Sequence, residues 1–71
     1  MYKLIDNLDE LYKKEASLKK IKIDNINWLT YYLDENTGQK WVKEYPHSEY
    51  HGGGAPQLRL IEKFPWEEKL S

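Results

Sequence analysis

A chain of 71 residues has room for one small domain with a marginal core, because short chains bury a smaller share of their surface. It contains no cysteine, which excludes disulfides and thiolate-based zinc sites. Its 11 basic and 12 acidic residues give a net charge of −1, which argues against nucleic-acid binding driven by charge. The first residues form no apolar run of signal-peptide length and nothing approaches a membrane span, so we expect a cytoplasmic protein without membrane contact.

The segment NLDELYKKEA predicts a short amphipathic helix over residues of about 7–16. Leu8 and Leu11 recur at helical spacing. Asn7, with Glu10 three residues later, has the pattern of a capping box that satisfies free amides at a helix start. The apolar stripe is narrow, so the helix can cover only one face of a neighbouring sheet.

Three later segments, residues of about 18–24, 28–34 and 39–45, predict an antiparallel meander. The turn ENTG places Gly38 where a four-residue loop needs positive φ. The turn DNIN, residues 24–27, plays the same part between the first two strands, since Asn27 tolerates a left-handed conformation.

These turns fix a register. A hairpin closed by ENTG pairs Asp34 with Gln39, Tyr32 with Trp41, Thr30 with Lys43, and Trp28 with Tyr45. A hairpin closed by DNIN pairs Ile23 with Trp28 and Ile21 with Thr30. One face of the meander then carries Ile21, Ile23, Trp28, Tyr32, Trp41 and Tyr45, and the other carries Leu29, Tyr31, Leu33 and Val42. A sheet that is apolar on both sides needs cover on both sides. The second face must be closed by the C-terminal segment, by a second copy in a homodimer, or by a partner.

The C-terminal third predicts a fourth strand at about 57–62, where Leu58 and Leu60 alternate with Arg59. Pro65 then breaks the pattern, and Phe64 and Trp66 either fold back as a lid or stay exposed. The predicted fold is α+β: a short N-terminal helix packed on a small antiparallel sheet of three to four strands, in a single domain spanning 1–71.

The stretch YPHSEYHGGGAP, residues 45–56, offers several kinds of site, and each lacks a required neighbour. His47 and His51 have no third ligand at a recognisable spacing for a metal. No Lys-Ser or Lys-Thr follows the glycines, as a phosphate loop needs. A histidine, glutamate and tyrosine set could support acid–base catalysis, but the chain is short for a cleft. We therefore expect no catalytic residue, no metal and no cofactor, and read the glycines as a sharp turn.

Two binding readings stay open. Sheet aromatics beside four lysines resemble a stacking platform for single-stranded nucleic acid; these are Lys20, Lys22, Lys40 and Lys43. Against this, a small domain needs its largest side chains in the core. Aromatics and histidine beside a glycine loop, rimmed by glutamates, are typical of a protein-binding edge.

The run from Asn27 to Ile61 resembles the immunity protein 27 family of bacterial polymorphic toxin systems. The matching features are Trp28, Tyr31, Tyr32, Gly38, Trp41, Tyr45, Pro46, Ser48, Glu49, His51, Gly52, Gly53, Gly54, Pro56, Leu58 and Ile61. The match covers about half the chain, and its most specific part is Tyr-Pro followed by HGGG. Ala55 stands where a second proline is expected, and Asn27 where a turn glycine is common.

The resemblance implies a cytoplasmic antidote that binds a cognate toxin, often a nuclease, and needs neither catalysis nor a cofactor. Such a protein either plugs the toxin's active site or clamps it elsewhere. Carboxylates that mimic phosphate would come from Glu44, Glu49, Glu62, Glu67 and Glu68. The candidate partner-binding residues are Glu44, Ser48, Glu49, Tyr50, His51 and Trp66; the expected scaffold residues are Trp28, Gly38, Trp41, Tyr45, Pro46, His51, Gly52, Gly53, Gly54 and Pro56.

Overall fold

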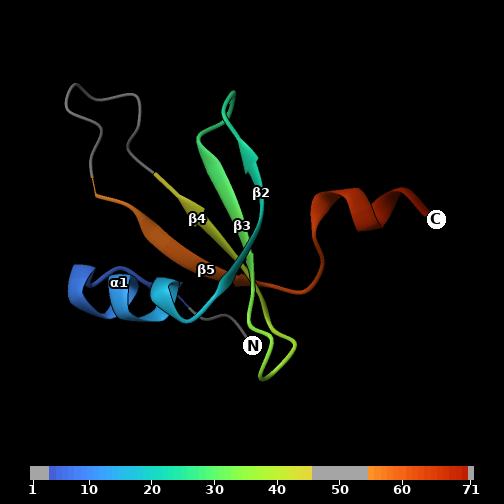
Figure 1. Cartoon of the computed structure of the whole chain (residues 1–71). Coiled ribbons are helices and arrows are strands. Elements are labelled where there is room, and N and C mark those ends of the chain that lie inside the picture. The colour runs from blue at the N-terminus through green and yellow to red at the C-terminus, as the bar shows by residue number, and fades with distance from the viewer. Residues whose placement is uncertain (1–3, 46–54, 71) are drawn as a thin grey trace.

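The computed structural model describes residues 4–45 and 55–70, with side chains as far as Glu67 in the second stretch. Within these residues one helix packs on an antiparallel sheet, as predicted (Figure 1). The elements in chain order are β1 (Leu4–Ile5), α1 (Leu8–Ala16), β2 (Lys19–Asp24), β3 (Leu29–Leu33), β4 (Lys40–Glu44), β5 (Gln57–Ile61) and the 3₁₀ helix η1 (Pro65–Leu70).

The helix starts where its capping pattern predicts. Asn7 is the N-cap, and its side-chain oxygen accepts a hydrogen bond of 3.1 Å from the amide of Glu10. Leu11 is fully buried against the sheet, whereas Leu8 is 42% exposed. The helix therefore contributes a narrow apolar stripe to the core.

Among the described residues the sheet has five strands in the order β1-β5-β4-β3-β2, so the expected number of three to four is wrong. The missing strand is β1, which pairs Leu4 with Arg59 and Ile5 with Leu58 of β5. Two residues are too few to show the alternation that marks a strand in a sequence. Because β1 and β2 lie at opposite edges, α1 crosses one face of the sheet between them (Figure 1).

The turn between β3 and β4 is as predicted. Tyr32 pairs with Trp41 and Thr30 with Lys43, and the amide of Asp34 donates to the carbonyl of Gln39 at 2.8 Å. Gly38 has a φ of 78°, the left-handed conformation that glycine adopts without steric cost.

The predicted pairing of β2 with β3 is wrong. Ile23 pairs with Thr30, not with Trp28, and Asp24 pairs with Leu29. Asp24 stays in the strand because its carboxylate accepts hydrogen bonds from the amides of the next turn, so the turn occupies residues 25–28. A register shift between Lys20 and Lys22 moves the rest of the strand by one residue.

Two separate apolar clusters cover the two faces of the sheet. On the α1 side the buried residues are Leu11, Tyr32, Trp41 and Leu58, and on the opposite side they are Tyr31, Val42 and Phe64. Of the three ways to close the second face, the C-terminal segment is the one observed. Ile21 and Ile23, expected in the core, are 40% and 49% exposed because β2 is an edge strand beyond the reach of α1.

Asp34 joins the β3–β4 turn to the helix. The residue is 5% exposed. Its carboxylate accepts a hydrogen bond of 2.9 Å from the ammonium of Lys14 in α1 and one of 3.0 Å from the amide of Asn36. The hydrogen bond from Lys14 holds the pKa of Asp34 below its ordinary value, and burial only partly opposes this effect. The ionised form of Asp34 is therefore the form that stabilises the fold.

A pair of leucines on the same helix tests the core. We expect Leu11→Ala to lower the free energy of unfolding by about 2–5 kcal/mol, because a buried leucine leaves a cavity. We expect Leu8→Ala, at an exposed position, to change it by less than about 0.5 kcal/mol. Urea denaturation of both variants checks this, and equal losses would contradict the assignment of Leu11 to the core.

Acid should weaken the contribution of Asp34. A carboxylate whose pKa is lower in the folded than in the unfolded state stabilises the fold above its unfolded pKa, and this stabilisation is lost as the pH falls through the folded value. We expect Asp34→Asn to be less stable than the parent at pH 7, with the difference shrinking below about pH 4. Lys14→Met should show the same trend in urea denaturation at a series of pH values. A difference independent of pH would argue against an ion pair.

Candidate partner-binding surface

The predicted partner-binding residues divide into two groups. Ser48, Glu49, Tyr50 and His51 lie outside the described residues, as do the scaffold positions Pro46, Gly52, Gly53 and Gly54. Glu44 and Trp66 are described, and they lie on different elements, Glu44 at the end of β4 and Trp66 in η1. The role of each in binding stays a prediction, and the structure adds what each of these two side chains contacts.

Glu44 is engaged within the fold. Its carboxylate accepts hydrogen bonds from Arg59 at 3.1 and 3.2 Å and from Gln57 at 2.6 Å, and its side chain is 20% exposed. Burial raises the pKa of Glu44, but the hydrogen bonds from Arg59 and Gln57 and the charge of Arg59 outweigh it, so the pKa lies below its ordinary value. The carboxylate is thus ionised, and its hydrogen bonds join β4 to β5.

Trp66 folds back onto the sheet. Its ring stacks on Phe64 at 4.7 Å between centroids and meets the ring of Tyr31 edge-on at 5.1 Å. The ammonium of Lys22 lies 5.2 Å from the centre of the Trp66 ring. Trp66 therefore closes part of the second apolar face and leaves a partly exposed ring.

Glu67 holds the start of η1 in place. Its carboxylate accepts from Lys40 at 2.6 and 2.9 Å and from the amide of Phe64 at 2.8 Å. The hydrogen bond from Lys40 lowers the pKa of Glu67, so this group too is ionised and paired. Like Glu44, it is bound to a cation within the protein.

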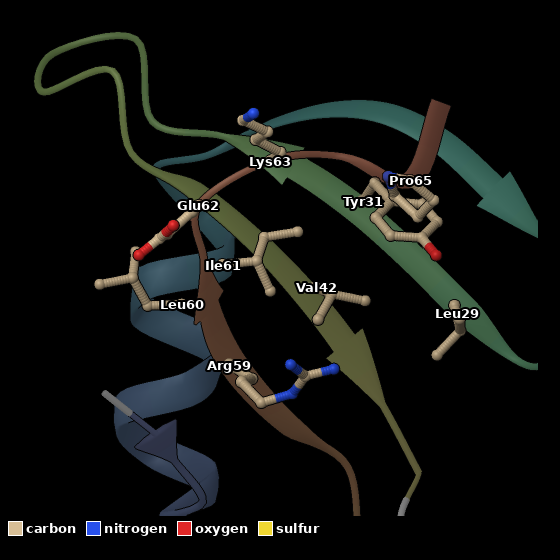
Figure 2. Close-up of a pocket in the computed structure, with 9 residues that line it drawn as sticks. All are labelled: Leu29, Tyr31, Val42, Arg59, Leu60, Ile61, Glu62, Lys63 and Pro65. Atoms are coloured by element: carbon tan, nitrogen blue, oxygen red, sulfur yellow. The ribbon is translucent and has the colours of Figure 1, made fainter. Parts of the chain in front are cut away.

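The C-terminal segment leaves a hollow of about 550 Å³ beside Pro65 on the face opposite α1 (Figure 2). Figure 2 shows Val42 of β4 at its floor between Arg59 of β5 and Tyr31 of β3, with the helix behind the sheet. The full lining is Leu29, Tyr31, Val42, Arg59, Leu60, Ile61, Glu62, Lys63 and Pro65. The hollow has an apolar floor and charged edges.

The turn between β2 and β3 presents a surface that the sequence reasoning missed. Trp28 was expected inside a strand opposite Ile23, but it lies in the turn with 66% of its surface exposed, and Ile26 is 88% exposed. The predicted strand pairing of Trp28 with Tyr45 is not found, because Trp28 lies in the turn, although the two rings meet edge-on at 6.3 Å. A second hollow, of about 360 Å³, lies among Ile23, Trp28 and Tyr45. The one available signal was a lone isoleucine within an otherwise polar turn sequence.

Other kinds of site find little support in residues 4–45 and 55–70. There, no three His, Cys, Asp or Glu side chains come close enough together to hold a metal ion. Within the same residues, no helix has the length and apolar character needed to cross a membrane. Both histidines lie outside these ranges.

Comparison with known proteins identifies the family. No curated protein and no solved structure matches the chain. The family model described as Immunity protein 27 matches residues 4–62, a range that contains all the strands named above and the helix α1. The match thus extends to the N-terminal segment, which did not carry the resemblance in the sequence. The chain belongs to the immunity protein 27 family.

Proposed function

We propose that the protein is an antitoxin that neutralises a cognate bacterial toxin by stoichiometric binding in the cytoplasm. Membership of the immunity protein 27 family carries this proposal. On this proposal the protein acts without catalysis or a cofactor, and the toxin is a polymorphic toxin with nuclease activity. The protein then protects the producing cell by binding the toxin before the toxin reaches its substrate.

The charges of the described surface favour recognition by shape and apolar contact over mimicry of phosphate. Mimicry needs carboxylates that are free to meet the toxin's cations. Glu44 is paired with Arg59, and Glu67 is paired with Lys40. Breaking such a pair to bind a partner would cost its hydrogen bonds within the protein, so these groups are poorly suited to replace a nucleic-acid backbone.

The alternative function, binding of single-stranded nucleic acid by aromatic residues of the sheet, needs rings that are exposed. Tyr32 is 3% exposed, and Trp41 is fully buried under α1. Buried rings cannot stack on bases. The sheet aromatics therefore support the fold, and the antitoxin reading is favoured.

The proposal is tested with the toxin encoded beside the gene for this protein. We expect a complex of one antitoxin with one toxin domain and a Kd in the nanomolar range, because neutralisation must hold at low cellular concentrations. Isothermal titration calorimetry gives the stoichiometry and affinity, and a nuclease assay should reach full inhibition at one equivalent. A matched oligonucleotide titration serves as the comparison. Absence of binding to the neighbouring toxin, or tighter binding to the oligonucleotide, would contradict the proposal.

A further inference from the structure

The turn between β2 and β3 exposes two large apolar side chains. Ile26 and Trp28 are the most exposed large hydrophobic residues in the described part of the chain, at 88% and 66%. They contribute little burial to the core, and both lie outside the two core clusters. Exposed tryptophan is a common anchor in protein interfaces, where burial of one ring supplies much of the binding energy.

Trp28 also holds an unfavourable backbone conformation. Its φ is 59°, in the left-handed region that bulky residues rarely adopt, while its neighbour Asn27 would tolerate that region better. A glycine at this position would relieve the conformation and cost little burial. Strain at an exposed aromatic position points to a role other than stability.

The turn presents these side chains in a fixed arrangement. The carboxylate of Asp24 accepts from the amides of Ile26 and Asn27 at 3.0 and 3.1 Å, and from the Asn27 side chain at 2.9 Å. The Trp28 ring rests with its neighbour Tyr45 in an edge-on contact. Such prior order lowers the entropy that a partner must overcome on binding.

We propose that Ile26 and Trp28, at the tip of the β2–β3 hairpin, insert into an apolar pocket of the toxin, and that the toxin places carboxylates along the edge strand β2. This inference rests on the proposed antitoxin function and names the surface that performs it. The carboxylates are assigned from charge complementarity, because β2 is an exposed edge strand that carries Lys19, Lys20 and Lys22 and runs away from the tip.

The same lysines argue against a second copy of this chain as the occupant. Two side chains per copy fall well short of the roughly 800 Å² that each partner buries in a stable interface. A homodimer would have to extend its contact along β2, where it would bring the lysines of both copies together. A toxin with carboxylates at that place meets no such repulsion.

Asp24 argues against nucleic acid as the occupant. In the described residues its carboxylate has hydrogen bonds from the turn and no ion pair. The hydrogen bonds from Asn27 keep the pKa of Asp24 below its ordinary value, so the group is negative at neutral pH. A negative charge at the base of the tip repels a phosphate backbone that would otherwise stack a base on Trp28.

The test compares two exposed aromatic positions in binding to the neighbouring toxin. We expect Trp28→Gly to weaken the affinity by about 30-fold or more, the range of an interface hot spot. Its thermal midpoint should be unchanged or higher, because glycine accepts the positive φ. The control is Tyr12→Ala on α1, which removes a ring that is 53% exposed and should leave the affinity within about threefold.

Two further variants separate the tip from the lysines. Ile26→Asn, at a position with almost no burial, should weaken binding by about tenfold without affecting folding. Lys20→Glu should slow association and weaken binding further at low salt, as a change at a complementary rim does. Unchanged affinity for Trp28→Gly and Ile26→Asn would overturn the inference.

The remaining outcomes also decide. If Trp28→Gly abolishes a dimer seen by sedimentation, or abolishes oligonucleotide binding, the tip serves a copy or a nucleic acid and the inference is wrong. If the parent protein fails to bind the neighbouring toxin, the proposed function fails and this inference fails with it. If the parent binds and the tip variants bind equally well, only the assignment of the surface fails.

Discussion

A sheet that is apolar on both faces governs this fold. The two central strands place large side chains alternately on each side, with Tyr32 and Trp41 toward α1 and Tyr31 and Val42 away from it. One helix of nine residues can cover one face only. The C-terminal segment supplies the second cover through Phe64 and Trp66, so a short chain closes both faces with two small elements.

Both covers depend on carboxylates that pair with the sheet. Glu15 of α1 accepts from Tyr32 and Lys43, and Glu67 of η1 accepts from Lys40. Burial raises the pKa of Tyr32, and its bond to Glu15 raises it further, so the phenol keeps its proton and donates. Asp34 and Lys14 repeat the arrangement at the β3–β4 turn. Of the acidic residues considered for phosphate mimicry, Glu67 is engaged in holding a cover and Glu44 in pairing with Arg59 across β4 and β5.

The sequence predicted those parts of the fold where a local pattern and the tertiary structure agree. The capping pattern at Asn7, the glycine turn at Gly38 and the pairing of Tyr32 with Trp41 follow from spacing and backbone chemistry alone. The family resemblance was also confirmed, since the family model matches residues 4–62. The predicted β2–β3 register was wrong because the true register depends on hydrogen bonds that Asp24 accepts from the turn and on an irregularity near Lys20. The presence of turn-forming residues in the sequence fixes neither of these. The same error hid the exposed surface of Trp28, which was placed inside a strand.

On the proposed binding mode, stability and recognition lie in different parts of this sheet. The covers meet its middle, where Leu11, Trp41 and Val42 are buried, whereas the β2–β3 turn lies beyond α1. In an antiparallel meander the β4–β5 connection, which begins at Tyr45, leaves from the same end as that turn. The contact between Trp28 and Tyr45 joins the two. A left-handed tryptophan costs roughly 1–2 kcal/mol relative to ordinary backbone, and only a part of the chain that the core does not rely on can carry such a cost. On that binding mode, a substitution in the turn would alter recognition without disturbing the buried core.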